Sequence, residues 1–219
     1  MTLSAIVFDF DGLILDTEWS VYTAIAEIYI EHGFELDLDW WRSMVGTPEG
    51  VDWTEQLEAL VGTPLDHDYL FNRSSHRHHE LVDAMEPMPG VVDLIEAAHL
   101  EGLRLAVASS SMTGWLDRNL TRVGLYHRFD ALCGRDRAGG RGKPAPDVYL
   151  AALADIGVAA PEAVAIEDSP HGVSAAKAAG LRCIAVPNRI TAPGDFSEAD
   201  LVVDSVAALT LAELHARFG

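Results

Sequence analysis

The stretch IVFDFDGLILDTE, Ile6 to Glu18, opens with an apolar run that ends at Asp9. A second carboxylate, Asp11, follows two residues later, and Gly12 comes directly after it. A buried strand does not end in paired carboxylates without a reason, because a buried charge is costly unless it is paired or binds a metal. The role of these two acids therefore depends on what the rest of the chain brings to the same place.

Short apolar runs like this one recur along the chain and predict strands. Most are continuous rather than alternating, as expected for strands covered on both faces. Between them lie helical patterns followed by a glycine, the usual stop signal. The alternation predicts an α/β fold with a Rossmann-like parallel sheet. The expected strands are Ala5–Phe8, Arg104–Ala108, Ala163–Ile166, Cys183–Val186 and Leu201–Val203, with a weaker one at Ala131–Cys133, and the expected helices are Val91–Glu101, Thr113–Val123, Pro146–Ile156 and Gly172–Ala179.

The stretch from Thr17 to Glu86 departs from this rhythm, because it contains helical patterns and no convincing strand. It ends at PMPG, Pro87 to Gly90, a natural linker. We therefore expect an α/β core domain of residues 1–16 and 87–219, with an all-helical domain of residues 17–86 inserted after the first strand. The expected helices of the insertion are Thr17–His32, Leu38–Met44, Gly50–Leu60 and Asp66–Met85.

The composition predicts a soluble globular protein. Of 219 residues, 49% are hydrophobic and 22% are charged, and the net charge is −19. Such a charge argues against general affinity for nucleic acid or anionic membranes. We expect a cytoplasmic protein, because Asp9 interrupts the first apolar run before a signal peptide can form and no run approaches the roughly 18 apolar residues of a membrane span. Cys133 and Cys183 have no metal-ligand spacing and are expected to be buried, reduced thiols.

Reactive side chains lie at the ends of four expected strands or in the loops beyond them. In an open parallel sheet, ligands bind beyond the carboxyl ends of the strands, so we expect these side chains to converge. They are Asp9 and Asp11 after the first strand, Ser109 and Ser110 after LRLAVA, Lys143 in GKPAPD after the weaker strand, and Glu167 and Asp168 in AVAIED.

This set of side chains has a chemical logic. Carboxylates are hard oxygen ligands that suit Mg²⁺, and serine hydroxyls, backbone N–H groups and a lysine can hold a phosphate. Asp9 could attack phosphorus, and Asp11, on the same side of an extended chain, could move the proton. Each residue alone has an ordinary explanation as a cap, a turn residue or a solvated side chain. The joint pattern is what favours phosphoryl chemistry.

DFDGLILDTE, the serine in LAVASSS, KPAPD and IEDSPHG together resemble the four motifs of the haloacid-dehalogenase superfamily of phosphohydrolases. The helical insertion resembles the type-1 cap of its beta-phosphoglucomutase-like subfamily. The resemblance covers essentially the whole chain. It implies that the cap closes over the substrate and chooses the leaving group.

The resemblance also implies roles for the site residues. Asp9 would be the nucleophile and Asp11 the general acid and base. Ser109, Ser110 and Lys143 would bind phosphate. Mg²⁺ would be held by Asp9, the backbone carbonyl of Asp11 and Asp168, with Glu167 in support. The dehalogenase branch lacks the second acid, so Asp11 indicates phosphoryl chemistry rather than carbon–halogen hydrolysis.

Three other patterns are given ordinary interpretations. GRGKPA, Gly140 to Ala145, matches a dinucleotide fingerprint but lacks a strong preceding strand, so it is interpreted as a flexible loop carrying Lys143. The histidines of RSSHRHHE are interpreted as a solvated helix face rather than a metal site. Trp40 and Trp41 are interpreted as packing within the helical insertion rather than as a substrate pocket.

The expected function is that of a monomeric, Mg²⁺-dependent phosphatase acting on a small phosphomonoester such as a sugar phosphate. The alternatives are a beta-phosphoglucomutase-type hexose-phosphate mutase and a catalytically idle binding protein. In the mutases that the chain resembles, a cap arginine and a cap histidine hold the second phosphate and assist the acid. An ungapped alignment places those positions on Glu49 and Val21, which favours hydrolysis. Arg42, Arg73 or Arg77 could supply the arginine instead.

Overall fold

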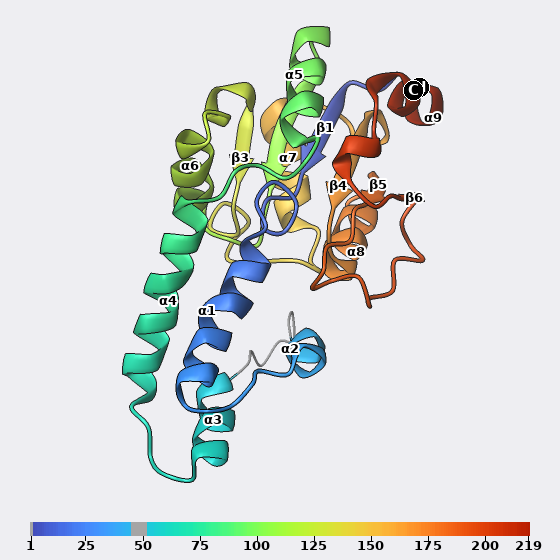
Figure 1. The fold of residues 1–219 in the computed structure, drawn as a ribbon. Helices are drawn as coiled ribbons and strands as arrows, with labels where there is room; N and C mark the ends of the chain where they lie inside the picture. The colour runs from blue at the N-terminus through green and yellow to red at the C-terminus, as the bar shows by residue number, and fades with distance from the viewer. Residues whose placement is uncertain (1, 45–51) are drawn as a thin grey trace. The chain divides into compact units, whose positions relative to one another are not determined.

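The computed structural model describes residues 2–44 and 52–219 (Figure 1). In this part of the chain, six strands form one parallel sheet in the order β3-β2-β1-β4-β5-β6. This confirms the predicted α/β class and the parallel sheet. The strands are β1 (Ala5–Phe8), β2 (Arg104–Ala108), β3 (Ala131–Cys133), β4 (Ala163–Glu167), β5 (Arg182–Ala185) and β6 (Leu201–Val202).

In the sheet-containing part of the chain, helices separate most of the strands in the sequence. They are α5 (Val91–Glu101), α6 (Thr113–Arg122), α7 (Asp147–Ile156), α8 (Pro170–Ala178) and α9 (Leu211–Phe218), with single turns η1 (Tyr126–Arg128), η2 (Ala160–Glu162) and η3 (Val206–Ala208). Helix α8 begins two residues earlier than expected, because Ser169 caps it and Pro170 takes the first helical position, where its missing N–H costs nothing. Helix α9 was not predicted from the sequence.

The core of the sheet is apolar on both faces. Ala5 and Val7 of β1 are fully buried in a cluster that includes residues of α7 and α8. The alternate residues Ile6 and Phe8 are fully buried as well. Because successive side chains of a strand point to opposite faces, β1 is covered on both sides, which explains its unbroken apolar sequence.

The helical part of the chain is held together by aromatic packing and caps. It consists of α1 (Thr17–Glu31), α2 (Leu38–Met44), α3 (Trp53–Val61) and α4 (His67–Asp83). The buried Tyr29 hydroxyl donates to the Trp53 carbonyl at 2.9 Å, and Trp53 packs edge-on against Phe71. Asp52 and Asp66 cap α3 and α4. Trp41 is buried, as expected for packing.

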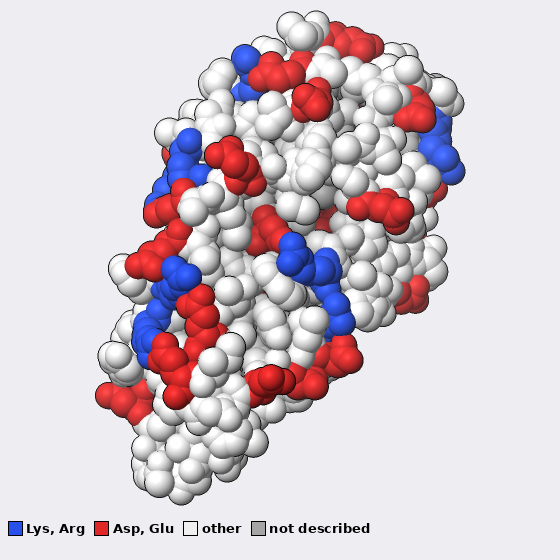
Figure 2. Space-filling view, viewed as in Figure 1, with Lys and Arg blue, Asp and Glu red and all other residues white. Residues whose placement is uncertain are grey.

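The chain divides into two compact units, Met1–Asp16 with Glu86–Gly219, and Thr17–Met85. The second boundary lies one residue before the one expected from the sequence. Glu49 lies outside the described residues. Within the described ranges no helix combines the length and apolar character needed to cross a membrane. On the face drawn in Figure 2, acidic side chains are spread widely among fewer basic ones, consistent with the net charge of −19.

Candidate active site

The expected site residues lie at the centre of the sheet. Strand β1 is flanked by β2 and β4, and the strand order reverses direction between these neighbours. Phe8 is in register with Val107 of β2 and Ile166 of β4, so the three strands end at the same level. Asp9 continues β1 and donates its N–H to the carbonyl of Ile166 at 2.9 Å. This is the position at which parallel α/β sheets bind ligands.

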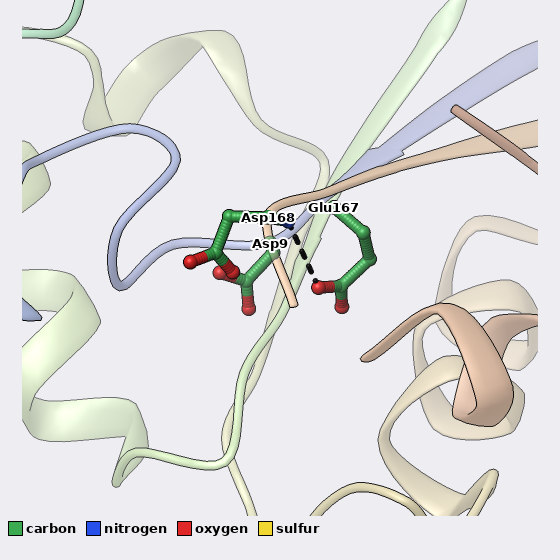
Figure 3. Close-up of side chains that lie close together, drawn as sticks. All are labelled: Asp9, Glu167 and Asp168. Carbon is green, nitrogen blue, oxygen red and sulfur yellow. Dashed lines mark hydrogen bonds between the residues drawn. The ribbon is translucent and has the colours of Figure 1, made fainter. Parts of the chain in front are cut away.

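Three carboxylates meet beyond these strand ends. Asp9, Glu167 and Asp168 are all buried, and each offers an oxygen within 4.8 Å of the others. Figure 3 shows the three carboxyl groups gathered at this point, with the N–H of Asp168 donating to Glu167 at 3.2 Å. Among the described residues, no other group of three His, Cys, Asp or Glu residues is arranged to hold a metal ion.

Lys143 lies between two of these acids. Its ammonium group pairs with Asp9 and, at 2.5 Å, with Glu167, and its side chain is only 6% exposed. The ammonium also sits 5.2 Å from the ring centre of Tyr149, whose hydroxyl donates to Glu167 at 2.5 Å. A charge buried this deeply is tolerated because it is paired and hydrogen-bonded.

The pKa values of the site follow from this burial. Desolvation raises the pKa of Asp9, and the charges of Glu167 and Asp11 add to the rise, whereas Lys143 opposes it. Burial alone would lower the pKa of Lys143, but Asp9 and Glu167 outweigh it and raise that pKa. The ammonium is therefore held charged beside the carboxylates.

Glu167 is the most enclosed of the three acids. Its side chain is fully buried, and its oxygens accept from Lys143, Tyr149, the N–H of Asp168 and, at 3.4 Å, the hydroxyl of Ser169. Gly172 of α8 lies directly against it, and a Cβ there would overlap the carboxyl group. These donors and the close approach of Gly172 hold the Glu167 carboxyl group in one orientation.

Asp11 accepts hydrogen bonds from side chains that follow β2 in the sequence. The hydroxyls of Ser109 and Ser111 donate to Oδ2 at 3.1 and 2.7 Å, and the indole N–H of Trp115 donates to Oδ1 at 3.0 Å. Sequence reasoning singled out Ser109 but missed Ser111 and Trp115. Trp115 lies within α6, where an aromatic residue reads as ordinary helix packing.

The two serines of the β2 end have different environments. Ser109 is buried, and its Oγ also accepts from the N–H of Ser111 at 2.9 Å. Ser110 is exposed, and its hydroxyl accepts from the backbone N–H of Lys143 at 3.0 Å. Ser110 therefore ties the loop that carries Lys143 to the end of β2.

Asp168 is held by a residue that sequence reasoning did not consider. Asn188, beyond the end of β5, donates from Nδ2 to Asp168 Oδ2 at 2.7 Å. The sequence did contain one indication that Asn188 lies near the site. It is a polar residue that follows the parallel strand β5, which lies beside β4.

The residues present fit Mg²⁺. The cluster consists of carboxylate oxygens, which Mg²⁺ prefers, and contains neither a thiolate nor an imidazole that would favour a softer metal. Because Glu167 is surrounded by donors, it suits the support of such a site better than direct ligation.

The other candidate features lie apart from this chemistry. His76 and His79 are exposed, as expected, but His78 is half-buried and its Nδ1 lies 2.8 Å from the hydroxyl of Ser20. The solvated interpretation was therefore wrong for His78. Cys133 and Cys183 are free and buried, as predicted, and burial raises the pKa of Cys133 to about 12.

Comparison with known proteins places the chain in a family. The profile of the haloacid dehalogenase-like hydrolases matches residues 6–186. The chain is 38% identical over 212 residues to the protein YhcW of Bacillus subtilis, covering 97% of this chain and 96% of that one. It belongs to the haloacid dehalogenase-like hydrolase family, and it is an enzyme of that family.

Other relatives carry more specific names. The fructose-1-phosphate phosphatase YqaB of Escherichia coli is 32% identical over 84% of this chain and 96% of its own length. The beta-phosphoglucomutase of Bacillus subtilis is 30% identical over 97% of this chain and 94% of its own. The crystal structure of CbbY from Rhodobacter sphaeroides in complex with phosphate superimposes with a TM-score of 0.72 at 32% identity, covering 94% of this chain and 96% of that one.

Proposed function

We propose that this protein is a Mg²⁺-dependent phosphatase that hydrolyses a small sugar phosphate through an aspartyl-phosphate on Asp9. Family membership and the phosphate complex of CbbY support phosphoryl chemistry, and the name of YqaB supports a sugar phosphate. The observation that carries the proposal is the convergence of Asp9, Lys143 and Asp168 beyond the central strands.

In the proposed first step, a carboxylate oxygen of Asp9 bonds to phosphorus while the bond from phosphorus to the leaving oxygen breaks. Asp11 gives its proton to that oxygen, which leaves as the alcohol. Water then attacks phosphorus and loses its proton to Asp11, and the acyl-phosphate bond breaks. This releases inorganic phosphate and restores the Asp9 carboxylate.

The contacts of Asp11 set a condition on this step. Its carboxyl accepts from Ser109, Ser111 and Trp115 in this structure. To protonate a leaving oxygen, Asp11 has to direct a protonated carboxyl oxygen at the substrate, and a rotation away from one of these donors would achieve this. Release of Ser109 from Asp11 would also make its hydroxyl available to the phosphate, the role proposed for Ser109.

Lys143 and the metal ligands have complementary proposed roles. Lys143 holds Asp9 in place and supplies positive charge for the transferring phosphoryl group. Asp9, the carbonyl of Asp11 and Asp168 would hold Mg²⁺, which neutralises charge on the phosphoryl oxygens. Glu167 supports the set by holding Lys143.

A mutase requires a second grip on phosphate, because it keeps a bisphosphorylated intermediate. The arginines of the helical unit that could provide this grip are engaged with acids. Arg77 makes a two-pronged pair with Glu27 at 2.8 and 3.0 Å and also contacts Glu80, and Arg73 pairs with Glu31. A second phosphate would have to displace these carboxylates, which favours hydrolysis.

The remaining candidates fit a mutase no better. Arg42 pairs with Asp39 at 2.8 Å, and Val21 of α1 has no group that transfers a proton.

The proposal is tested with a panel of phosphorylated metabolites in Mg²⁺, measuring inorganic phosphate, with Asp9→Asn as the control. We expect release from at least one sugar phosphate. A panel with no release above the control would overturn the phosphatase and favour an idle binding protein. The mutase is tested with beta-glucose 1-phosphate and catalytic glucose 1,6-bisphosphate, and glucose 6-phosphate that accumulates faster than phosphate would overturn hydrolysis.

A further inference from the structure

We propose that Asn188 is a positioning residue for the divalent cation, because it joins the two segments that carry the proposed metal ligands. This inference rests on the proposed function. Asn188 follows β5 and donates from Nδ2 both to Asp168 Oδ2 at 2.7 Å and to the carbonyl of Gly12 at 3.2 Å. Gly12 directly follows Asp11, so one amide group touches the loop after β1 and the acid at the end of β4.

The orientation of this amide is fixed by the rest of its hydrogen bonds. Oδ1 accepts from the backbone N–H groups of Ile190 at 2.8 Å and Thr191 at 3.1 Å. Its partners on that side are donors, and its partners on the other side, Asp168 and Gly12, are acceptors. The network therefore assigns the nitrogen to the metal-site side without ambiguity.

The turn alone does not explain the choice of asparagine. Aspartate would accept the same two backbone N–H groups and form the same turn. Only the NH₂ half of the side chain distinguishes the two residues. Of its two observed partners, Asp168 is a proposed metal ligand and Gly12 directly follows Asp11. Aspartate would instead place a second carboxylate against Asp168.

The loop after β1 packs closely against the contact between Asn188 and Asp168. Gly12 has a φ of 85°, and a Cβ there would overlap both Asp168 Oδ2 and Asn188 Nδ2. The backbone of the loop therefore rests directly on the pair. Asn188 is anchored in turn, because its N–H donates to the Thr191 hydroxyl at 3.0 Å and Ile190 is buried.

This arrangement predicts an effect on cation selectivity. Mg²⁺ demands nearly ideal octahedral geometry, whereas Ca²⁺ accepts looser arrangements of oxygen. Because Asn188 fixes the spacing between Asp168 and the loop after β1, loss of its side chain should weaken Mg²⁺ binding more than Ca²⁺ binding. Partners that orient metal ligands typically contribute about 10–100-fold to affinity.

The test measures Mg²⁺ and Ca²⁺ binding by isothermal titration calorimetry on the metal-free protein, independently of turnover. We expect Asn188→Ala to weaken Mg²⁺ binding by about 10–100-fold and Ca²⁺ binding by less. The control is Thr191→Val, which removes the acceptor of the Asn188 N–H and disturbs the same turn but keeps the amide donor. Thr191→Val should weaken Mg²⁺ binding much less than Asn188→Ala does.

Four results would overturn the inference. Unchanged Mg²⁺ affinity in Asn188→Ala would remove Asn188 from the site. Equal losses of Mg²⁺ and Ca²⁺, or equal losses in Asn188→Ala and Thr191→Val, would reduce Asn188 to a structural turn residue. Failure of the unsubstituted protein to bind Mg²⁺ would overturn both this inference and the proposed metal dependence. If the unsubstituted protein binds Mg²⁺ and Asn188→Ala binds it equally well, only the role of Asn188 is overturned.

Discussion

Replacement of Gly172 by alanine should destabilise the protein, although alanine is the better helix former. A Cβ on Gly172 would overlap the Glu167 carboxyl group, which would have to retreat by about 1 Å or more to reach an ordinary contact distance. Glu167 is fully buried and cannot move without loosening its bonds to Lys143 and Tyr149.

The magnitude follows from three terms. Crowding in a packed core costs about 1–3 kcal/mol. Weakening hydrogen bonds to a buried charged group costs about 1.5–3 kcal/mol. Alanine in place of glycine in a helix returns about 0.5–1 kcal/mol. The net loss is therefore about 1.5–5.5 kcal/mol, a large share of the roughly 5–15 kcal/mol that stabilises a typical protein.

The assay is urea-induced unfolding followed by circular dichroism. The matched control is Gly114→Ala in α6, where the same new methyl group would meet no atom within 4 Å. The control should be as stable as the unsubstituted protein, or more stable by up to about 1 kcal/mol. If Gly172→Ala is as stable as the control, the close contact between α8 and Glu167 does not exist as described.

Further predictions address the chemistry and the sheet edge. Asp11→Asn should slow hydrolysis of alkyl phosphates by about 10²–10⁴-fold and of nitrophenyl phosphate by less, because that leaving group needs no proton; equal losses would contradict the role of Asp11 as acid. Ca²⁺ should inhibit the Mg²⁺-dependent reaction, because its looser coordination can misdirect the Asp9 carboxylate, and full activity in chelator would exclude metal dependence. Burial would raise the pKa of Asp200, but bonds from Lys177 and the Cys183 N–H outweigh it and lower that pKa. Asp200→Asn should therefore cost about 0.5–1 kcal/mol at neutral pH, measured by urea unfolding. Because the folded pKa is the lower one, this gap should close as the pH falls below about 4, and a gap that widens in acid would contradict the assignment.

The strands were predictable because their physical cause is local. A strand buried on both faces needs a continuous apolar run, and β1, β2 and β3 have the bounds read from the sequence. Helix α9 was missed although Thr210 and Glu213 form a capping box and Gly219 follows its last residue, because a helix of eight residues gives only a short periodic pattern.

The residues of the candidate site also fall into those that the local sequence could predict and those that it could not. Asp9, Glu167 and Asp168 could be predicted because they come immediately after two apolar runs, Ala5–Phe8 and Ala163–Ile166, that end together in a parallel sheet. Trp115, Tyr149 and Asn188 could not, because each lies in an ordinary helix or turn and becomes relevant only through its contact with a distant acid. Sequence patterns thus located the acids that converge beyond the central strands, whereas the groups that contact and orient these acids depend on tertiary packing.

The central claim is that Asp9 is the nucleophile, and Asp9→Asn tests it most directly. The amide is nearly isosteric but cannot attack phosphorus. The variant should therefore retain its fold, which thermal unfolding checks, while its rate of phosphate release falls by more than about 10³-fold. Turnover is measured with Mg²⁺ on a phosphomonoester that the unsubstituted enzyme hydrolyses. A folded Asp9→Asn variant that keeps more than about a thousandth of the activity would contradict covalent catalysis at Asp9.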